Sequence, residues 1–142
     1  MASTNFTNFT RALATAGHNF SSDSLKVLLV SSVPSETDLD SWANRSDVTN
    51  EITGTGYTAG GITQAYTLNA LDTTNNRQSI TMTNITSGWT TATFTTVGAI
   101  IYKDTGSAAT DKLIQFVDFS GSQSVSSGTF GITYTTDLLI TR

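Results

Sequence analysis

The sequence predicts a mainly β protein, an antiparallel β-sandwich or jelly-roll-like domain with a short N-terminal helix or arm. Three observations predict this fold class. Threonine, whose β-branched side chain fits a pleated strand, occurs 28 times in 142 residues. Charged residues make up only 13% of the chain, about half the usual share. Apolar and polar residues also alternate through most of the second half, as they do in half-buried strands.

The length of the chain favours a single domain. At 15.0 kDa, two domains would each be too small to fold without disulfides or a metal, and the chain has no cysteine. We therefore expect one β-rich domain over residues 1–142, in which residues 1–23 form a helix or arm and residues 24–142 the sandwich.

The first segment contains the one good helix pattern. Phe6, Phe9, Leu13 and Ala16 follow helical spacing, and Gly17 is placed to end the helix. A helix this short needs an apolar surface to pack on. Phe6 and Phe9 can supply that contact on the protein's own sheet, which we favour, or they can belong to an arm that docks into another subunit.

The next two elements have clear local signals. Residues 25–30 (LKVLLV) are almost all apolar, which predicts a central strand buried on both faces. Ser35, followed three residues later by Asp38, resembles a capping box. It predicts one turn of helix that seats Leu39 and Trp42 in the core.

Residues 54–61 (GTGYTAGG) are rich in glycine and separate a mixed front part from an almost wholly β rear part. The spacing superficially resembles a dinucleotide-binding loop. Such a loop needs a helix directly after the glycines, whereas the following ITQAYTLNA alternates like a strand. We therefore predict a turn or bulge with glycines at positive φ and Tyr57 at its tip.

The rear part is predicted as a series of antiparallel strands. One strand spans residues 62–70, a second begins at Ile80 and Met82, and a third covers 92–101 with an irregularity between Phe94 and Val97. The last two strands, 113–119 and 130–134, are joined by a polar loop at 120–128. Another polar loop at 104–111 precedes them.

Charge and composition argue against two classes of partner. The net charge is −4, and the seven basic residues are scattered along the chain, so we expect no nucleic-acid partner. No apolar run is long enough to cross a bilayer, and the N-terminus does not look like a signal peptide. We therefore expect no membrane partner and synthesis in a cytoplasm.

The residue types needed for catalysis are scarce. A serine or cysteine nucleophile needs a neighbouring base, but the chain has no cysteine and a single histidine, His18. His18 follows the predicted helix, where a histidine is favoured by the helix dipole. We therefore predict that the protein is not an enzyme and carries no cofactor.

An acidic segment leaves one metal hypothesis open. Its carboxylates come from Glu36, Asp38, Asp40, Asp47 and Glu51. Asp38, Asp40 and Asp47 could ligate Ca²⁺, although the EF-hand spacing is not met. We favour a solvated acidic loop made of turn and cap residues.

Four stretches together resemble a family of small virion proteins of tailed bacteriophages. They are SLKVLLVSS (24–32), NEITGTGYTAGG (50–61), AIIYKDTGSAATDKLIQFVDF (99–119) and SGTFGITY (127–134), in the same order as in that family. The resemblance covers most of the chain from residue 24 onward. It implies a location in the virion, and it brings no catalytic residues with it.

From these observations we expect a capsid decoration or cement protein on the surface of the virion, assembled in the bacterial host cytoplasm. Its expected partners are the major capsid protein and further copies of itself, most simply as a homotrimer that gains avidity by gripping several sites. The candidate interface residues are aromatic, since aromatics dominate binding hot spots. They are Phe6, Phe9, Trp42, Tyr57 and Trp89.

A second hypothesis from another class is a binding module of a tail or head fibre that recognises host surface carbohydrate. In that case Trp42, Tyr57 or Trp89 would stack on sugar rings. An enzyme such as a glycosidase is the least favoured hypothesis, because the chain lacks the residues for it.

Overall fold

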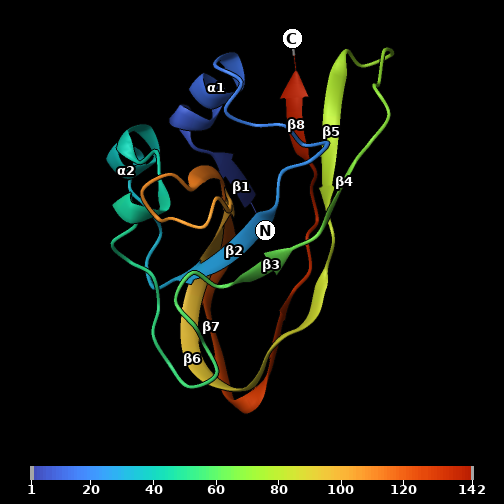
Figure 1. The fold of residues 1–142 in the computed structure, drawn as a ribbon. Coiled ribbons are helices and arrows are strands. Elements are labelled where there is room, and N and C mark those ends of the chain that lie inside the picture. Colours follow the sequence, from blue (N-terminus) through green and yellow to red (C-terminus); the bar gives the residue numbers. More distant parts are fainter. Residues whose placement is uncertain (1, 142) are drawn as a thin grey trace.

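The protein folds into two antiparallel sheets with two short α-helices, as a computed structural model covering residues 2–141 shows (Figure 1). The strand order is β1-β7-β6-β2-β3 in the large sheet and β4-β5-β8 in the small one. This architecture confirms the predicted fold class, a mainly β sandwich-like fold with a short helix near the N-terminus. The elements are β1 (Ala2–Asn5), α1 (Thr7–Ala14), β2 (Leu25–Val30), α2 (Glu36–Ser41), a 3-10 turn (Arg45–Asp47), β3 (Ile62–Gln64), β4 (Tyr66–Leu68), β5 (Arg77–Met82), β6 (Ile85–Lys103), β7 (Lys112–Ile132) and β8 (Leu138–Thr141).

Strand β2 is the central apolar strand that the sequence predicts. It pairs along its whole length with β6 and, at its first three residues, with β3 on the other side. Every side chain of β2 except Lys26 is buried, so the run of apolar residues is explained by burial on both faces.

The capping box of α2 is also present. The Ser35 hydroxyl accepts a hydrogen bond from the Asp38 amide, and the Asp38 carboxylate accepts one from the Ser35 amide. Leu39 and Trp42 are buried, as predicted. Helix α1 lies beside α2 at the left of Figure 1 and ends at Ala14, two residues before the predicted end at Ala16.

The N-terminal segment contributes a strand that was not predicted. β1 pairs with β7 in the register Ala2↔Asp118 to Asn5↔Gln115 and forms an edge of the large sheet. The backbone of this segment therefore continues the sheet, and the segment does not form a free arm before α1.

The prediction of one continuous strand over residues 62–70 is wrong, because the chain passes from one sheet to the other in the middle of this segment. β3 belongs to the large sheet and β4 to the small one. At the corner, the buried Gln64 amide donates to the carbonyls of Ala65 and Thr83 at 2.7 and 2.9 Å. These bonds satisfy the backbone where the ladder breaks. Ile80 and Met82 likewise close β5 instead of beginning it.

The predicted polar loop at 120–128 is also wrong. These residues lie inside β7, a single strand of 21 residues that pairs with the 19-residue β6. The loop at 104–111 does join the two strands, as predicted. β6 and β7 therefore form one long two-stranded ribbon instead of a meander of short strands.

This ribbon bends. Figure 1 shows β6 and β7 curving together at the bottom of the view. The outer end of β6 follows β5 after residues 83–84, and the outer end of β7 leads to β8 through the segment 133–137. Register shifts on both sides of Ala92 mark the bend. Thr91 and Ser127, which adjoin the Ala92↔Gly128 pair, both have positive φ, at 51° and 48°. The two strands thus kink at the same level, as strands do where they turn a corner between sheets.

The kink generates a test. A β-branched residue with positive φ is strained by about 1 kcal/mol or more, and glycine removes that strain. We expect Thr91→Gly to leave the free energy of unfolding unchanged or to raise it slightly. Thr90→Gly, at an exposed neighbouring position with ordinary φ, is expected to lower it by about 1 kcal/mol. Urea unfolding of both variants measures the difference, and equal losses would contradict the strain at Thr91.

Candidate interaction surface

Four of the five predicted interface residues are buried, and the fifth, Tyr57, is half-buried. Phe6, Phe9 and Trp89 are at most 2% exposed, and Trp42 is 9% exposed. The ring of Phe6 stacks on that of Trp42, with centroids 6.5 Å apart. Phe6 and Phe9 thus pack α1 onto the protein's own sheet, which is the interpretation we favoured over docking. An interaction surface has to be sought at other residues.

Tyr57 does not sit at the tip of a turn as predicted. Its half-buried ring points inward and stacks on Trp89, with centroids 6.2 Å apart. Its hydroxyl donates to Glu51 Oε1 at 2.7 Å and accepts from the Leu29 amide at 3.1 Å. Burial raises the pKa of Tyr57 well above its usual value. Tyr57 therefore pins the glycine-rich segment to β2.

The acidic residues have structural partners. Asp38 caps α2, Asp47 accepts from the amides of Ala43 and Asn44, and Asp40 accepts from the Thr7 hydroxyl. Across residues 2–141, no three acidic, histidine or cysteine side chains come together in a way that could hold a metal ion. The set Asp38, Asp40 and Asp47 is thus spread over caps and contacts rather than gathered around one point.

One ion pair is buried deeply enough to matter for stability. Asp111 has a side chain with 0% exposure, and it accepts from Arg45 Nε at 2.8 Å and from the amide and hydroxyl of Thr105. Burial alone would raise the pKa of Asp111, but the hydrogen bonds from Thr105 and Arg45 and the charge of Arg45 outweigh it and lower the pKa. The pair ties the 3-10 turn to the loop between β6 and β7.

His18 lies in the core rather than at a helix end. Its side chain has 0% exposure, stacks on Phe20 at 5.7 Å and meets the edge of Phe9 at 5.2 Å. Nδ1 is 3.7 Å from Asp23, and neither ring nitrogen has a hydrogen-bond partner among the described residues. Burial lowers the pKa of His18 to about 4, with Asp23 opposing and Lys103 and Lys112 adding to the effect. A neutral imidazole enclosed in this way has no access to a substrate.

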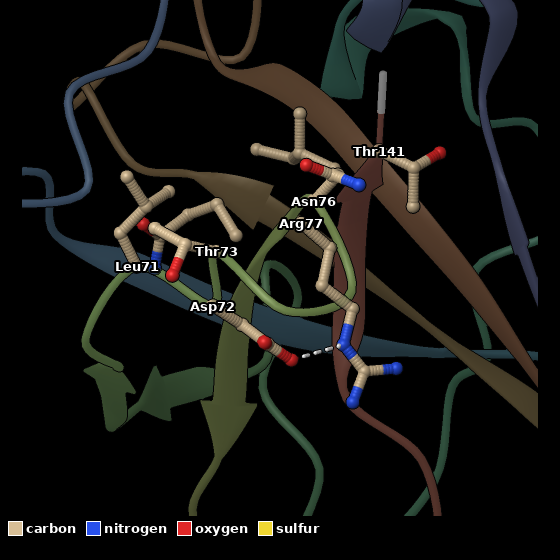
Figure 2. Close-up of a pocket in the computed structure, with 8 residues that line it drawn as sticks. Leu71, Asp72, Thr73, Asn76, Arg77 and Thr141 are labelled. Carbon is tan, nitrogen blue, oxygen red and sulfur yellow. Dashed lines mark hydrogen bonds and ion pairs between the residues drawn. The ribbon is translucent and has the colours of Figure 1, made fainter.

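The most exposed apolar surface lies at one end of the small sheet. We call this region the distal end and define it as the loop 69–76 with the adjoining strand ends Leu68, Arg77, Gln78, Ile140 and Thr141. Four large apolar side chains are exposed among residues 2–141. Leu68 and Leu71 belong to the distal end and Leu139 adjoins it; Leu71 is the most exposed at 68%. A shallow hollow of about 360 Å³ lies here, with Leu71 and Ile140 in its wall (Figure 2).

The loop of the distal end is held rigidly. Asp72 and Arg77 exchange two backbone hydrogen bonds, and their side chains form the ion pair marked in Figure 2, with 3.1 Å between Arg77 Nε and Asp72 Oδ2. The Asp72 carboxylate also accepts from the side chain and the amide of Asn75, and these bonds lower its pKa. Leu71 is thus presented beside a preorganised turn, which reduces the entropy lost when a partner binds.

The sequence could not single out the distal end. Leu71 lies in a polar stretch, LDTTNNR, that looks like an ordinary loop. Only the three-dimensional arrangement shows that β4 and β5 carry this loop away from the core and leave the wall of the hollow uncovered. The alternation through Tyr66 and Leu68 indicated a strand, but it did not indicate that Leu68 would be exposed.

Comparisons of the chain with protein-family models, curated proteins and solved structures find no match. The resemblance to small phage virion proteins therefore stays a prediction. Among residues 2–141, the helices are all too short and too polar to span a bilayer.

The environment of His18 predicts a pH dependence of stability. The unfolded chain binds a proton at His18 near pH 6.5, whereas the folded chain resists it until about pH 4. The free energy of unfolding should therefore fall as the pH drops, by about 2 kcal/mol between pH 6.5 and 5. His18→Phe is expected to flatten this part of the profile, as followed by urea unfolding at each pH. Parallel profiles for the two proteins between pH 7 and 5 would show that His18 is not responsible.

Proposed function

We propose that the chain is a non-catalytic structural protein of a bacteriophage virion, a decoration or cement protein that binds major capsid protein subunits on the shell. Two lines of argument support the proposal. The stretches quoted above resemble small virion proteins. The side chains that chemistry would need, His18 and the carboxylates of Asp111 and Glu51, are committed to the protein's own core and loops.

The observation that carries the proposal is the exposure of Leu71 beside a rigid turn. A large apolar side chain that is 68% exposed, next to a hollow walled by Ile140, gains free energy when a partner covers it. The Asp72–Arg77 pair gives the rim charges that can orient a partner. We therefore assign the contact with the shell to the distal end.

The carbohydrate-binding alternative is not carried further. A sugar platform needs an aromatic ring that is open to solvent on one face. Trp42 and Trp89 are at most 9% exposed, and Tyr57 is half-buried against Trp89. The aromatic residues that motivated this hypothesis are part of the core.

Binding to shells tests the assignment of the distal end. The binding assay uses co-sedimentation of the purified chain with shells that do not yet carry this protein. We expect Leu71→Asp to weaken this binding by tenfold or more, about 1.4 kcal/mol. Val33→Asp is the matched control, because Val33 is also exposed, at 53%, but lies outside the distal end. Equal binding of the two variants would remove the distal end from the interface.

The copy number tests the proposed location. A decoration protein should be present in hundreds of copies per virion by densitometry of virion bands, whereas tens of copies or fewer would place it in a tail or fibre.

Light scattering of the purified chain tests the homotrimer separately, since a trimer predicts a species of three chain masses at micromolar concentration. A monomer alone under these conditions would contradict self-association but not binding to the shell.

A further inference from the structure

The basic residues of this acidic protein are distributed unevenly. Four of those described are paired with carboxylates, in Lys26–Asp104, Arg45–Asp111, Arg77–Asp72 and Lys103–Asp23, with N–O distances of 2.8 to 3.1 Å. Among the lysines and arginines within residues 2–141, only Arg11 and Lys112 lack a carboxylate within 4 Å. Both of these residues line the same hollow.

This hollow has a volume of about 310 Å³ and lies between the last turn of α1, the end of the α2 segment and the start of β7. Its remaining wall is formed by Asn8, Ala12, Thr15, Gly17 and Ala43, none of which is acidic. Two positive charges thus share a concave surface without a negative charge of their own, while the whole protein carries a net charge of −4.

The other side-chain donors of the wall, on Asn8 and Thr15, already have acceptors. The Asn8 amide donates to the carbonyls of Asp40, Ser41 and Trp42, and the Thr15 hydroxyl donates to the Arg11 carbonyl. Lys112 Nζ donates to Asn44 Oδ1 at 3.0 Å, which positions the ammonium group without neutralising it. The binding capacity left in the hollow is therefore cationic.

We infer that this hollow binds an oxyanion, a carboxylate or a tetrahedral anion, held between the Arg11 guanidinium and the Lys112 ammonium. A guanidinium offers a planar pair of donors to such a group, and an ammonium adds a compact positive charge. The site is distinct from the distal end and does not depend on the proposed function. The ligand can be a free ion or an acidic side chain of a neighbouring subunit, which share this chemistry.

A second observation indicates a positive potential here. His18 follows Gly17 in the wall, and the charges of Lys103 and Lys112 both lower its pKa. Lys103 is neutralised by Asp23 at 2.9 Å, so Lys112 remains the uncompensated charge. Arg11 also lies in the last turn of α1, where a cation is favoured by the helix dipole. That role would stabilise the helix but would not produce saturable binding of an anion.

The single histidine of the chain provides a direct readout. We expect sulfate, added at constant ionic strength against sodium chloride, to shift the His18 imidazole resonance in a saturable way and to raise its pKa. Succinate, a dicarboxylate, tests the carboxylate source in a parallel arm. Saturation by sulfate alone would indicate a tetrahedral anion, and saturation by succinate an acidic peptide group.

Charge-matched variants complete the test. Arg11→Gln and Lys112→Gln should each weaken the apparent affinity about tenfold, since each removes one charged hydrogen bond. Lys26→Gln removes the same charge from the Lys26–Asp104 pair, outside the hollow and the distal end, and should leave the affinity unchanged. Arg11 is exposed, so its variant is expected to fold, which thermal unfolding without added anion checks. A shift that does not saturate with either anion, or that is the same in all three variants, would overturn the site.

Discussion

The bent ribbon of β6 and β7 is the constraint on which the rest of the structure depends. It carries the centre of the large sheet, turns at Ala92, and delivers the chain at both outer ends to β5 and β8 of the small sheet. Trp89, Phe94 and Phe130 fill the inside of the bend with centroids 5.3 to 6.3 Å apart. The two sheets are thus linked through one continuous hydrogen-bonded element, and Trp89, one of the aromatic residues that look suited to binding, is needed to fill its corner.

The glycine-rich segment 54–61 is fixed to this ribbon and to Glu51 by buried and half-buried polar contacts. Tyr102 donates to the Gly60 carbonyl at 2.7 Å, and Glu51 accepts from Tyr57 and from the Gly60 amide. Gly61 shows how close the approach is, because an added Cβ would lie 1.8 Å from the Val27 carbonyl oxygen. Polar groups that could serve chemistry are thereby used to satisfy backbone atoms in a chain with few charges.

Local signals predicted the elements that depend on local physics. The run 25–30 and the capping box at Ser35 were confirmed because burial on both faces and a helix start are visible in a few adjacent residues. The predictions for residues 62–70 and 120–128 were wrong for the opposite reason. The alternation of apolar and polar residues continues across a sheet change at Ala65. The serine- and glycine-rich stretch forms a strand because β6 supplies its hydrogen-bond partners.

The same distinction explains what could be known of function from the sequence. Aromatic residues were the natural candidates for an interface. However, only 37% of the residues of this small β protein are hydrophobic, so its core has to use nearly all of the large apolar side chains. Exposed Leu71 and the unpaired Arg11 and Lys112 are defined instead by what does not contact them. Pairing of the other four lysines and arginines that the structure describes joins positions up to 80 residues apart, as in Lys103 with Asp23. A charge left over after such pairing is a property of the folded chain, so it can be found only once every partner has been placed.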